Sequence, residues 1–329
     1  MIRRDALVAM LALAVPLEAF AQRPGKVWRI GVLAPAAGES TPGELSPYSA
    51  AFMTELGAAG QAFGTDYTIE MRSADGDYRR LPALANELVR LNVDIIIAVS
   101  PVAVSAAQQA SKVIPIVCIG AHDPVGLGFA ASLARPGGNL TGLATFYADL
   151  IPKHLELLKS IQPKISRVAI LVHSKGGKDA SVEQMLEDAA RRMGIRLQRV
   201  AIDAADQIPQ AFATMKRERA GGFITVADAL FLLERRQVAE LALKNRLPSL
   251  FAVRENVQAG GLMSYGEDFV EMFGQAARYV GKIMKGANPG ELPIEQPTKF
   301  RLTINRKTAA ALGLPIPQEL MLRADEVLG

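Results

Sequence analysis

The residues that could do chemistry in this sequence lie just after its most apolar segments. Runs such as 94–99 (DIIIAV) and 222–226 (GFITV) are typical of strands buried on both faces of a parallel sheet. Ligands of open α/β sheets bind beyond the carboxyl ends of the strands, where loops meet helix N-termini. This rule selects seven candidate ligand-binding residues at expected strand ends. They are Ser100, Asp123, Phe146, Ser174, Asp228, Glu255 and Tyr265.

Three of these candidates precede expected helices, and each has two interpretations. Ser100, followed by Pro101, could receive a ligand carboxylate on its hydroxyl and the neighbouring backbone N–H groups, or it could be an ordinary helix N-cap. Asp123 and Asp228 could each pair with a ligand ammonium group or cap the helix that follows. The sequence leaves both interpretations open.

The two aromatic candidates, Phe146 and Tyr265, end expected strands near points where the chain is predicted to pass between two lobes. Aromatic side chains at these positions could form the wall of a small apolar pocket. The alternative is that they pack in the protein core.

The sequence offers little for catalysis or metal binding. His122, His154 and His173 lack the spacing of metal ligands, and His154 is predicted to be solvated near a helix start. There is no nucleophile elbow, phosphate-binding loop or dinucleotide-binding glycine motif. We therefore predict a binding protein with no cofactor and no metal, not an enzyme. An enzyme would need His122 or His173 within hydrogen-bond reach of a carboxylate in the cleft.

Apolar strands and amphipathic helices alternate through most of the chain. In the segment 79–91, for example, Leu81, Leu84 and Leu88 share one helix face. Such alternation is typical of parallel sheets with helices on both faces. Strands are expected at 27–34, 94–99, 115–119, 167–172, 222–226, 248–251, 261–265 and 299–305, and helices at 79–91, 125–133, 151–160, 180–193, 208–217, 230–245 and 268–285.

The predicted elements divide into two Rossmann-like α/β lobes. After the strand at 261–265 come one helix, a Pro-rich segment and an isolated strand, which fits a chain that crosses back to the first lobe and returns. With the first passage between the halves this makes three crossovers, which would form a hinge. We expect the lobes at 26–145 plus 267–297 and at 146–266 plus 298–329.

The first 21 residues have the features of a cleavable secretory signal peptide. Arg3 and Arg4 precede a short apolar run at 6–15, and a small-x-small exit ends at Ala21. The run is shorter than the roughly 20 residues of a membrane-spanning helix. The single Cys118 lies far from the cleavage point, so we expect export to the periplasm without a lipid anchor. The export route, general or twin-arginine, stays open.

The composition is that of an ordinary globular protein. Hydrophobic residues make up 50% of the 329-residue chain and charged residues 21%, which excludes disordered, collagen-like and coiled-coil proteins. A single cysteine excludes a disulfide scaffold and a Cys-rich zinc site. The net charge is only +4, the basic residues are dispersed, and 6% of residues are aromatic, so no nucleic-acid partner is expected.

Several longer runs follow the pattern of a known family. They are residues 123–125 (DPV), 132–142 (SLARPGGNLTG), 259–266 (AGGLMSYG), 292–300 (LPIEQPTKF) and 323–327 (RADEV). In these runs the chain resembles the ABC-transporter substrate-binding family that contains the tryptophan/tyrosine-type binding proteins. The resemblance spans the chain beyond the signal segment and implies a type I periplasmic-binding fold, with a ligand cleft between the lobes.

The resemblance also implies roles for individual residues. Asp123 matches the family's Asp-Pro position, which implies that it faces the cleft as partner of a ligand amine. Tyr265 matches the last crossover, near the ligand, and Glu255 matches an acidic position common before the Ala-Gly-Gly run. The chain departs from the family pattern at 99–101, where members often carry a Gly-Gly-Thr-like run. The identity of the solute therefore stays open.

The function implied by the resemblance is that of the exported solute-binding component of an ABC import system. The protein would enclose a small solute, with an amino acid, aromatic or not, as a candidate, by hinge closure. Its partners would be this small-molecule ligand and an ABC permease in the inner membrane, and the chain itself would be a monomer. The alternative is a periplasmic ligand-sensing module for a membrane receptor, because the same fold serves both roles.

Overall fold

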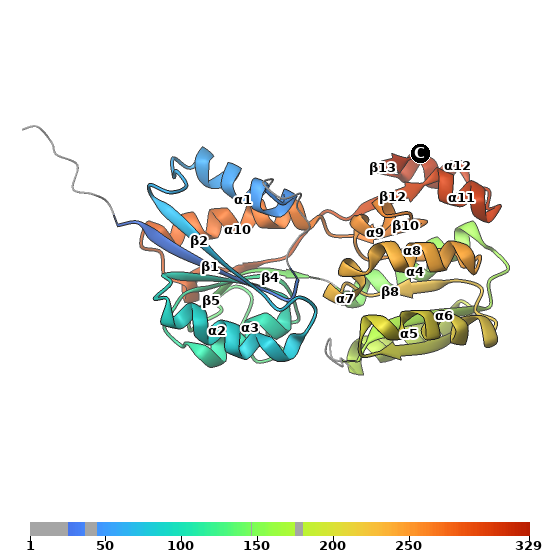
Figure 1. Cartoon of the computed structure of the whole chain (residues 1–329), viewed down its shortest axis with the longest axis horizontal. Helices are drawn as coiled ribbons and strands as arrows, with labels where there is room; N and C mark the ends of the chain where they lie inside the picture. The colour runs from blue at the N-terminus through green and yellow to red at the C-terminus, as the bar shows by residue number, and fades with distance from the viewer. Residues whose placement is uncertain (1–25, 37–44, 146, 175–179) are drawn as a thin grey trace, which may run out of the picture.

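Two bodies lie side by side along the long axis of the molecule (Figure 1). The computed structural model describes residues 26–36, 45–145, 147–174 and 180–329, so the predicted signal peptide lies outside the described residues. Each body is built on its own β-sheet. We call the body that contains the described N-terminal residues the first lobe and the other the second lobe.

The first lobe has a sheet of six described strands, which all pair in parallel, in the order β11-β5-β4-β3-β1-β2. Helices α1 (Pro47–Ala58) and α10 (Phe269–Met284) cover one face, and α2 (Leu81–Arg90) and α3 (Pro101–Ala110) cover the other (Figure 1). The central strands are continuous apolar runs because both faces are buried. The strands are β1 (Trp28–Ala34), β2 (Tyr67–Ser73), β3 (Ile95–Val99), β4 (Ile116–His122), β5 (Leu140–Thr145) and β11 (Ile294–Glu295).

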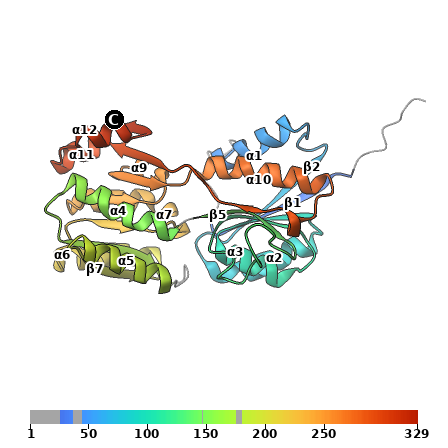
Figure 2. The same cartoon turned by 180° about the vertical axis from the view of Figure 1, so that it is seen from behind.

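The second lobe has a sheet of seven described strands in the order β13-β12-β10-β9-β8-β6-β7. Only β10 and β12 pair antiparallel among these strands, because the chain returns from the first lobe between them. One buried cluster of side chains lies under α4 and α5, and another lies under α6 and α8. Helix α4 is at the front in Figure 2. The strands are β6 (Arg167–His173), β7 (Arg196–Ile202), β8 (Phe223–Thr225), β9 (Ser249–Phe251), β10 (Met263–Gly266), β12 (Arg301–Asn305) and β13 (Glu326–Leu328). The helices are α4 (Tyr147–Ile161), α5 (Ala180–Arg192), α6 (Ile208–Arg217), α7 (Ala229–Leu233), α8 (Arg235–Lys244), α9 (Arg254–Gln258), α11 (Arg306–Leu312) and α12 (Gln318–Arg323).

The predicted α/β class and its two largely parallel sheets are confirmed. One predicted element is wrong, because residues 125–133 form turns instead of a helix. Asp123 has a positive φ of 39° and begins a turn closed by a Leu127 N–H to Asp123 O hydrogen bond of 3.0 Å. Gly128 follows with a φ of 73°, so the backbone leaves helical geometry within two turns.

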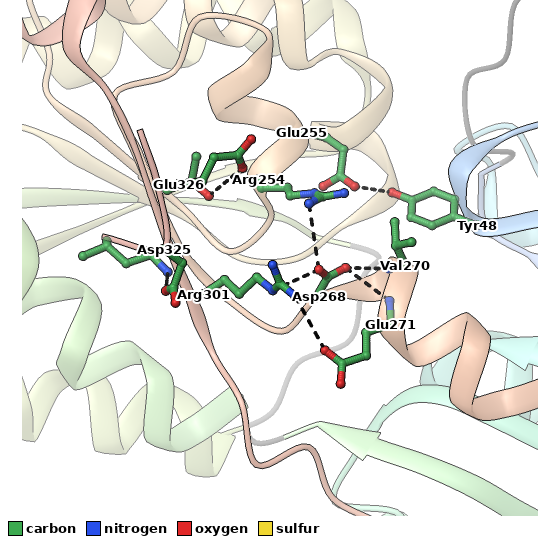
Figure 3. Close-up of polar contacts among 11 residues, drawn as sticks. Tyr48, Arg254, Glu255, Asp268, Val270, Glu271, Arg301, Asp325 and Glu326 are labelled. Atoms are coloured by element: carbon green, nitrogen blue, oxygen red, sulfur yellow. Dashed lines mark hydrogen bonds and ion pairs between the residues drawn. The ribbon is translucent and has the colours of Figure 1, made fainter. Parts of the chain in front are cut away.

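The chain passes between the lobes after β5, after β10 and after β11. A cluster that we call the crossover clasp, Arg254, Asp268, Glu271 and Arg301, joins the last two passages (Figure 3). The Asp268 carboxylate caps α10 by accepting from Val270 N–H at 2.9 Å, and it lies 3.1 Å from Arg301 Nε. The clasp therefore fixes the point where the chain enters the first lobe, at the start of α10, and the point where it returns to the second lobe, at β12.

We expect Asp268→Ala to lower the free energy of unfolding by about 1–2 kcal/mol, because it removes both the helix cap and the ion pairs. Asp268→Asn is the matched control, since it keeps a capping oxygen and loses only the charge. Urea unfolding should show a clearly smaller loss for the asparagine variant. Equal losses in the two variants would show that the cap contributes nothing.

His154, predicted to be solvated, is fully buried in the second lobe. Its Nε2 lies 2.6 Å from the backbone oxygen of Tyr265, and its Nδ1 has no hydrogen-bond partner among the described residues. Burial lowers the pKa of His154 to about 4, although the hydrogen bond with the Tyr265 backbone acts to raise it. The prediction of a solvated His154 was wrong because the amphipathic pattern of α4 alone does not reveal which of its polar residues lie against the sheet.

The low pKa of His154 makes stability depend on pH. The unfolded chain, with an ordinary histidine pKa of 6.5, binds more protons than the folded chain at any pH from about 6.5 down to about 4. Stability contributed by the neutral ring is therefore present above pH 6.5 and is lost as the pH falls through this window. We expect a loss of about 2 kcal/mol between pH 7 and pH 5. Urea unfolding of wild type and His154→Gln at both pH values checks this, and parallel pH dependences would contradict it.

Candidate functional site

A cavity of about 360 Å³ lies between the two lobes. Its wall includes the last residues of β3, β4 and β5 in the first lobe, which are Val99, His122 and Thr145, and His173 at the end of β6 in the second. The sequence rule therefore identifies the correct edge of both sheets. The volume lies within the range of roughly 300–1,000 Å³ that small-molecule sites usually have.

Apolar side chains form much of the cavity wall. In the second lobe, Ile170 and Val172 of β6, Leu197 of β7 and Leu186 of α5 lie together at the wall. Phe269 and Phe273 of α10 line the cavity from the first lobe. This lining suits a solute with a sizeable apolar group.

Two helix N-termini of the first lobe contribute polar groups to the wall. Ser46, which caps α1, and Ser100, which precedes α3, both line the cavity. The N–H groups in the first turn of a helix have no intrahelical partners and lie at the positive end of the helix dipole. Two such ends at one cavity favour an anionic group of the solute.

Ser100 does not cap α3 in the ordinary way. Its side chain makes no capping hydrogen bond, and its buried Oγ has no partner among the described residues. Its backbone, with φ 82° and ψ 158°, is in a region that residues other than glycine rarely adopt. The Ser100 side chain is therefore not an ordinary N-cap, and its hydroxyl, unpaired within the described ranges, belongs to a residue of the cavity wall.

Asp228, also in the cavity wall, is fully engaged by protein groups. One carboxylate oxygen, Oδ1, accepts from Leu230 N–H at 2.8 Å and lies 3.2 Å from His173 Nδ1. The other, Oδ2, accepts from the Tyr78 hydroxyl at 2.8 Å. The Asp228 side chain is 4% exposed and that of His173 is 2% exposed. Asp228 therefore caps α7, which is one of the two roles that the sequence left open. It also accepts a hydrogen bond from Tyr78 of the first lobe.

His173 and Asp228 meet the geometric condition that we set for an enzyme. However, Asp228 caps a helix and accepts from Tyr78, so both of its oxygens already have structural roles. The cap of α7 and the hydrogen bond to Tyr78 therefore account for the position of Asp228 beside His173 without a catalytic role.

Glu255 does not line the cavity, but it contacts a residue that does. Its Oε1 accepts from the hydroxyl of Tyr48 at 2.8 Å, as Figure 3 shows. The Tyr48 ring stacks on Phe273 with a centroid distance of 5.3 Å and an interplanar angle of 26°. Glu255 of the second lobe therefore forms a hydrogen bond with Tyr48 of the first lobe, which lines the cavity.

Three of the other candidates lie away from the cavity wall. Asp123 is not among the cavity-lining residues, and its carboxylate accepts from Gly126 N–H at 2.9 Å in its own turn; no helix follows for it to cap. Tyr265 packs against the core of the second lobe, with Phe300 at a ring distance of 6.0 Å. Ser174 continues from β6 and donates its N–H to Ile202 O at 2.9 Å. Phe146 lies outside the described residues.

Sequence reasoning missed Tyr48 and Tyr78, which both line the cavity. Tyr48 lies in the first turn of α1, and Tyr78 follows Asp77, which caps a 3-10 turn after β2. They do not follow continuous apolar runs, so the strand-end rule passed over them. Their position just after the helix-capping residues Ser46 and Asp77 was the available signal.

In the part of the chain that the structure describes, no helix combines the length and apolar character that a membrane span requires. A family model described as "ABC transporter substrate binding protein" matches residues 48–328. This match covers both lobes.

Individual relatives agree with this match. The tyrosine-binding protein of Clostridioides difficile (strain R20291) is 25% identical over 80% of this chain and 75% of its own length. Two solved structures each align with 92% of this chain. One is an ABC domain in complex with L-Trp from Streptococcus pneumonia, 20% identical over all of that chain with a TM-score of 0.83. The other is a ligand-free, open substrate binding protein with adhesive properties from Clostridium difficile, 22% identical over 99% of that chain with a TM-score of 0.65.

Proposed function

Because this chain belongs to the ABC transporter substrate binding protein family, we propose that it is the solute-binding component of an ABC import system. Members of this family bind substrates and are not enzymes, as the tryptophan complex illustrates. The observation that carries the proposal is the cavity of about 360 Å³ whose wall is supplied by both lobes. A solute in this position would contact both lobes and favour their closed arrangement.

The proposed solute is an amphipathic molecule with a carboxylate, and aromatic amino acids are the first candidates. Its carboxylate would lie at the N-termini of α1 and α3, with Ser100 donating its hydroxyl. Its apolar group would pack against Ile170, Val172 and Leu197 of the second lobe. The names of the related tyrosine-binding and tryptophan-bound proteins support this choice.

The proposed mechanism is closure of two domains about the passages that join them. We propose that the domains correspond to 26–145 plus 267–297 and to 146–266 plus 298–329. Sheet membership supports this division, because β11 joins the first sheet while β12 and β13 join the second. The family further supports a periplasmic location, a membrane permease as partner and no chemical change of the solute.

A thermal-shift screen of the purified protein tests the binding function. The panel contains L-tryptophan, L-tyrosine, the other amino acids and small carboxylates. A solute at 100 times its Kd stabilises the folded state by about 2.7 kcal/mol, which raises the unfolding temperature by several degrees. If no member of a wide panel shifts the transition, the proposal fails. Uptake of the strongest binder by cells with and without the gene then separates import from sensing, because a sensing module would leave uptake unchanged.

A further inference from the structure

Two tyrosines of the first lobe form hydrogen bonds with carboxylates of the second lobe. The Tyr48 hydroxyl donates to Glu255 and the Tyr78 hydroxyl donates to Asp228, in both cases at 2.8 Å. Both tyrosines line the cavity between the lobes. We call these two interlobe contacts the tyrosine latches.

The Tyr78 latch is held at several points. Besides donating to Asp228, the Tyr78 hydroxyl accepts from Ala229 N–H at 3.2 Å. The Tyr78 ring lies 5.1 Å from the His173 ring, which itself contacts Asp228. Since Asp228 caps α7, this latch attaches the first lobe to a helix N-terminus of the second lobe.

The Tyr48 latch is oriented by packing within its own lobe. The ring of Phe273, from α10, stacks on the Tyr48 ring and orients it. The Tyr48 hydroxyl then reaches Glu255 of α9 (Figure 3). Glu255 is next to Arg254 of the crossover clasp. The latch therefore lies beside the passage about which the lobes would move.

The chemistry of both contacts favours a persistent bond. A neutral hydroxyl donates to a carboxylate, which is a stronger hydrogen bond than one between two neutral groups. Burial, and then the neighbouring carboxylate, raise the pKa of Tyr48 and of Tyr78, so both hydroxyls keep their protons at any physiological pH. Separation of the lobes would break both bonds together.

We propose that Tyr48 and Tyr78 are positioning residues that hold the two lobes in the closed arrangement and thereby set the affinity for the solute. The part of this inference that concerns affinity rests on the proposed function. The part that concerns closure does not, because it can be measured without any solute.

Small-angle X-ray scattering of the ligand-free protein tests closure. The samples are wild type, Tyr48→Phe, Tyr78→Phe and the double variant, each of which loses a hydroxyl and keeps the ring. We expect each substitution to lower the ratio of closed to open molecules about tenfold and the double variant to lower it about 100-fold. The radius of gyration should rise accordingly.

Tyr279→Phe is the matched control. The Tyr279 hydroxyl donates to Pro293 O at 2.8 Å, and both residues belong to the first lobe, so its loss should leave the scattering unchanged. Superposable curves for wild type and a folded double variant, as judged by circular dichroism, would overturn the proposal. An equal change in Tyr279→Phe would overturn it as well.

A double-mutant cycle with Glu255→Ala, which removes the accepting oxygen, tests the partner of Tyr48. Each single variant should open the protein, and the pair should add little to either, because both changes remove the same contact. Fully additive changes would overturn the Tyr48 latch. Titration calorimetry with the strongest binder of the screening panel then tests affinity, with a Kd up to about 100-fold higher in the double tyrosine variant. If wild type binds nothing, the proposed function fails, while the scattering still decides what the tyrosines do.

Discussion

Ser100→Asp is expected to lower the affinity for a carboxylate-bearing solute by at least about 100-fold. The substitution would place a negative charge where the N-termini of α1 and α3 meet the cavity, next to the position proposed for the solute carboxylate. Two like charges about 4 Å apart repel each other by about 4 kcal/mol at the effective dielectric constant of a protein surface. Aspartate should be tolerated by the fold, since it is, like serine, a preferred residue immediately before a helix.

Ser100→Asn is the control for this experiment. Asparagine matches aspartate in shape and capping ability but has no charge, so we expect its effect on affinity to stay within about tenfold. Calorimetric titration of both variants with L-tryptophan, or with a stronger binder from the screening panel, measures the difference. Equal affinities of the aspartate and asparagine variants would place the solute's anionic group elsewhere or show that it has none.

Gly142→Ala is expected to destabilise the first lobe so strongly that little folded protein forms, with a loss of about 4 kcal/mol or more. Gly142 lies in β5 with a φ of 126°, a conformation that residues with a side chain rarely adopt. A Cβ at this position would lie 2.6 Å from the backbone nitrogen of Cys118 and closer still to its carbonyl oxygen. These are backbone atoms of β4, so the clash can be relieved only by separating two paired strands.

Gly60→Ala separates the steric clash from the cost of a positive φ. Gly60 also has a positive φ, 83°, but nothing lies within 4 Å of the position of its Cβ. We therefore expect it to cost only about 1–2 kcal/mol. Soluble yield, circular dichroism and urea unfolding of both variants check the comparison. A Gly142→Ala protein as stable as Gly60→Ala would mean that β4 and β5 can separate without loss.

The elements were predictable where the sequence pattern is local. Strands β1, β3 and β4 are continuous apolar runs because helices bury both of their faces, and such runs show in the sequence itself. The edge strands β2 and β7 carry charged residues and are only partly buried, so no apolar run marks them. The return of the chain to the first lobe was also predictable, because a single helix, a Pro-rich segment and a single strand follow the expected strand at 261–265, outside the regular alternation.

The same pattern could not decide which strand-end residues face the cavity. Ser100 and Asp123 both follow a buried strand, yet one lines the cavity without a capping bond and the other binds its own turn. The difference depends on backbone angles that the residue type does not reveal. The resemblance to the family implied that Asp123 faces the cleft. That expectation was drawn from its position in a sequence motif, which carries no information on its backbone angles.

What the sequence alone determined is the alternation of buried strands and amphipathic helices, their division into two α/β lobes and the edge of each sheet where a ligand would lie. Those properties follow from periodicity and from the handedness of βαβ units, which act over neighbouring residues. Only the tertiary structure decided that Tyr78 reaches Asp228, that Tyr48 reaches Glu255 and that His154 is buried. The physical reason is distance along the chain: 150 residues separate the partners in one latch and 207 in the other, so their contact depends on how the two sheets are placed.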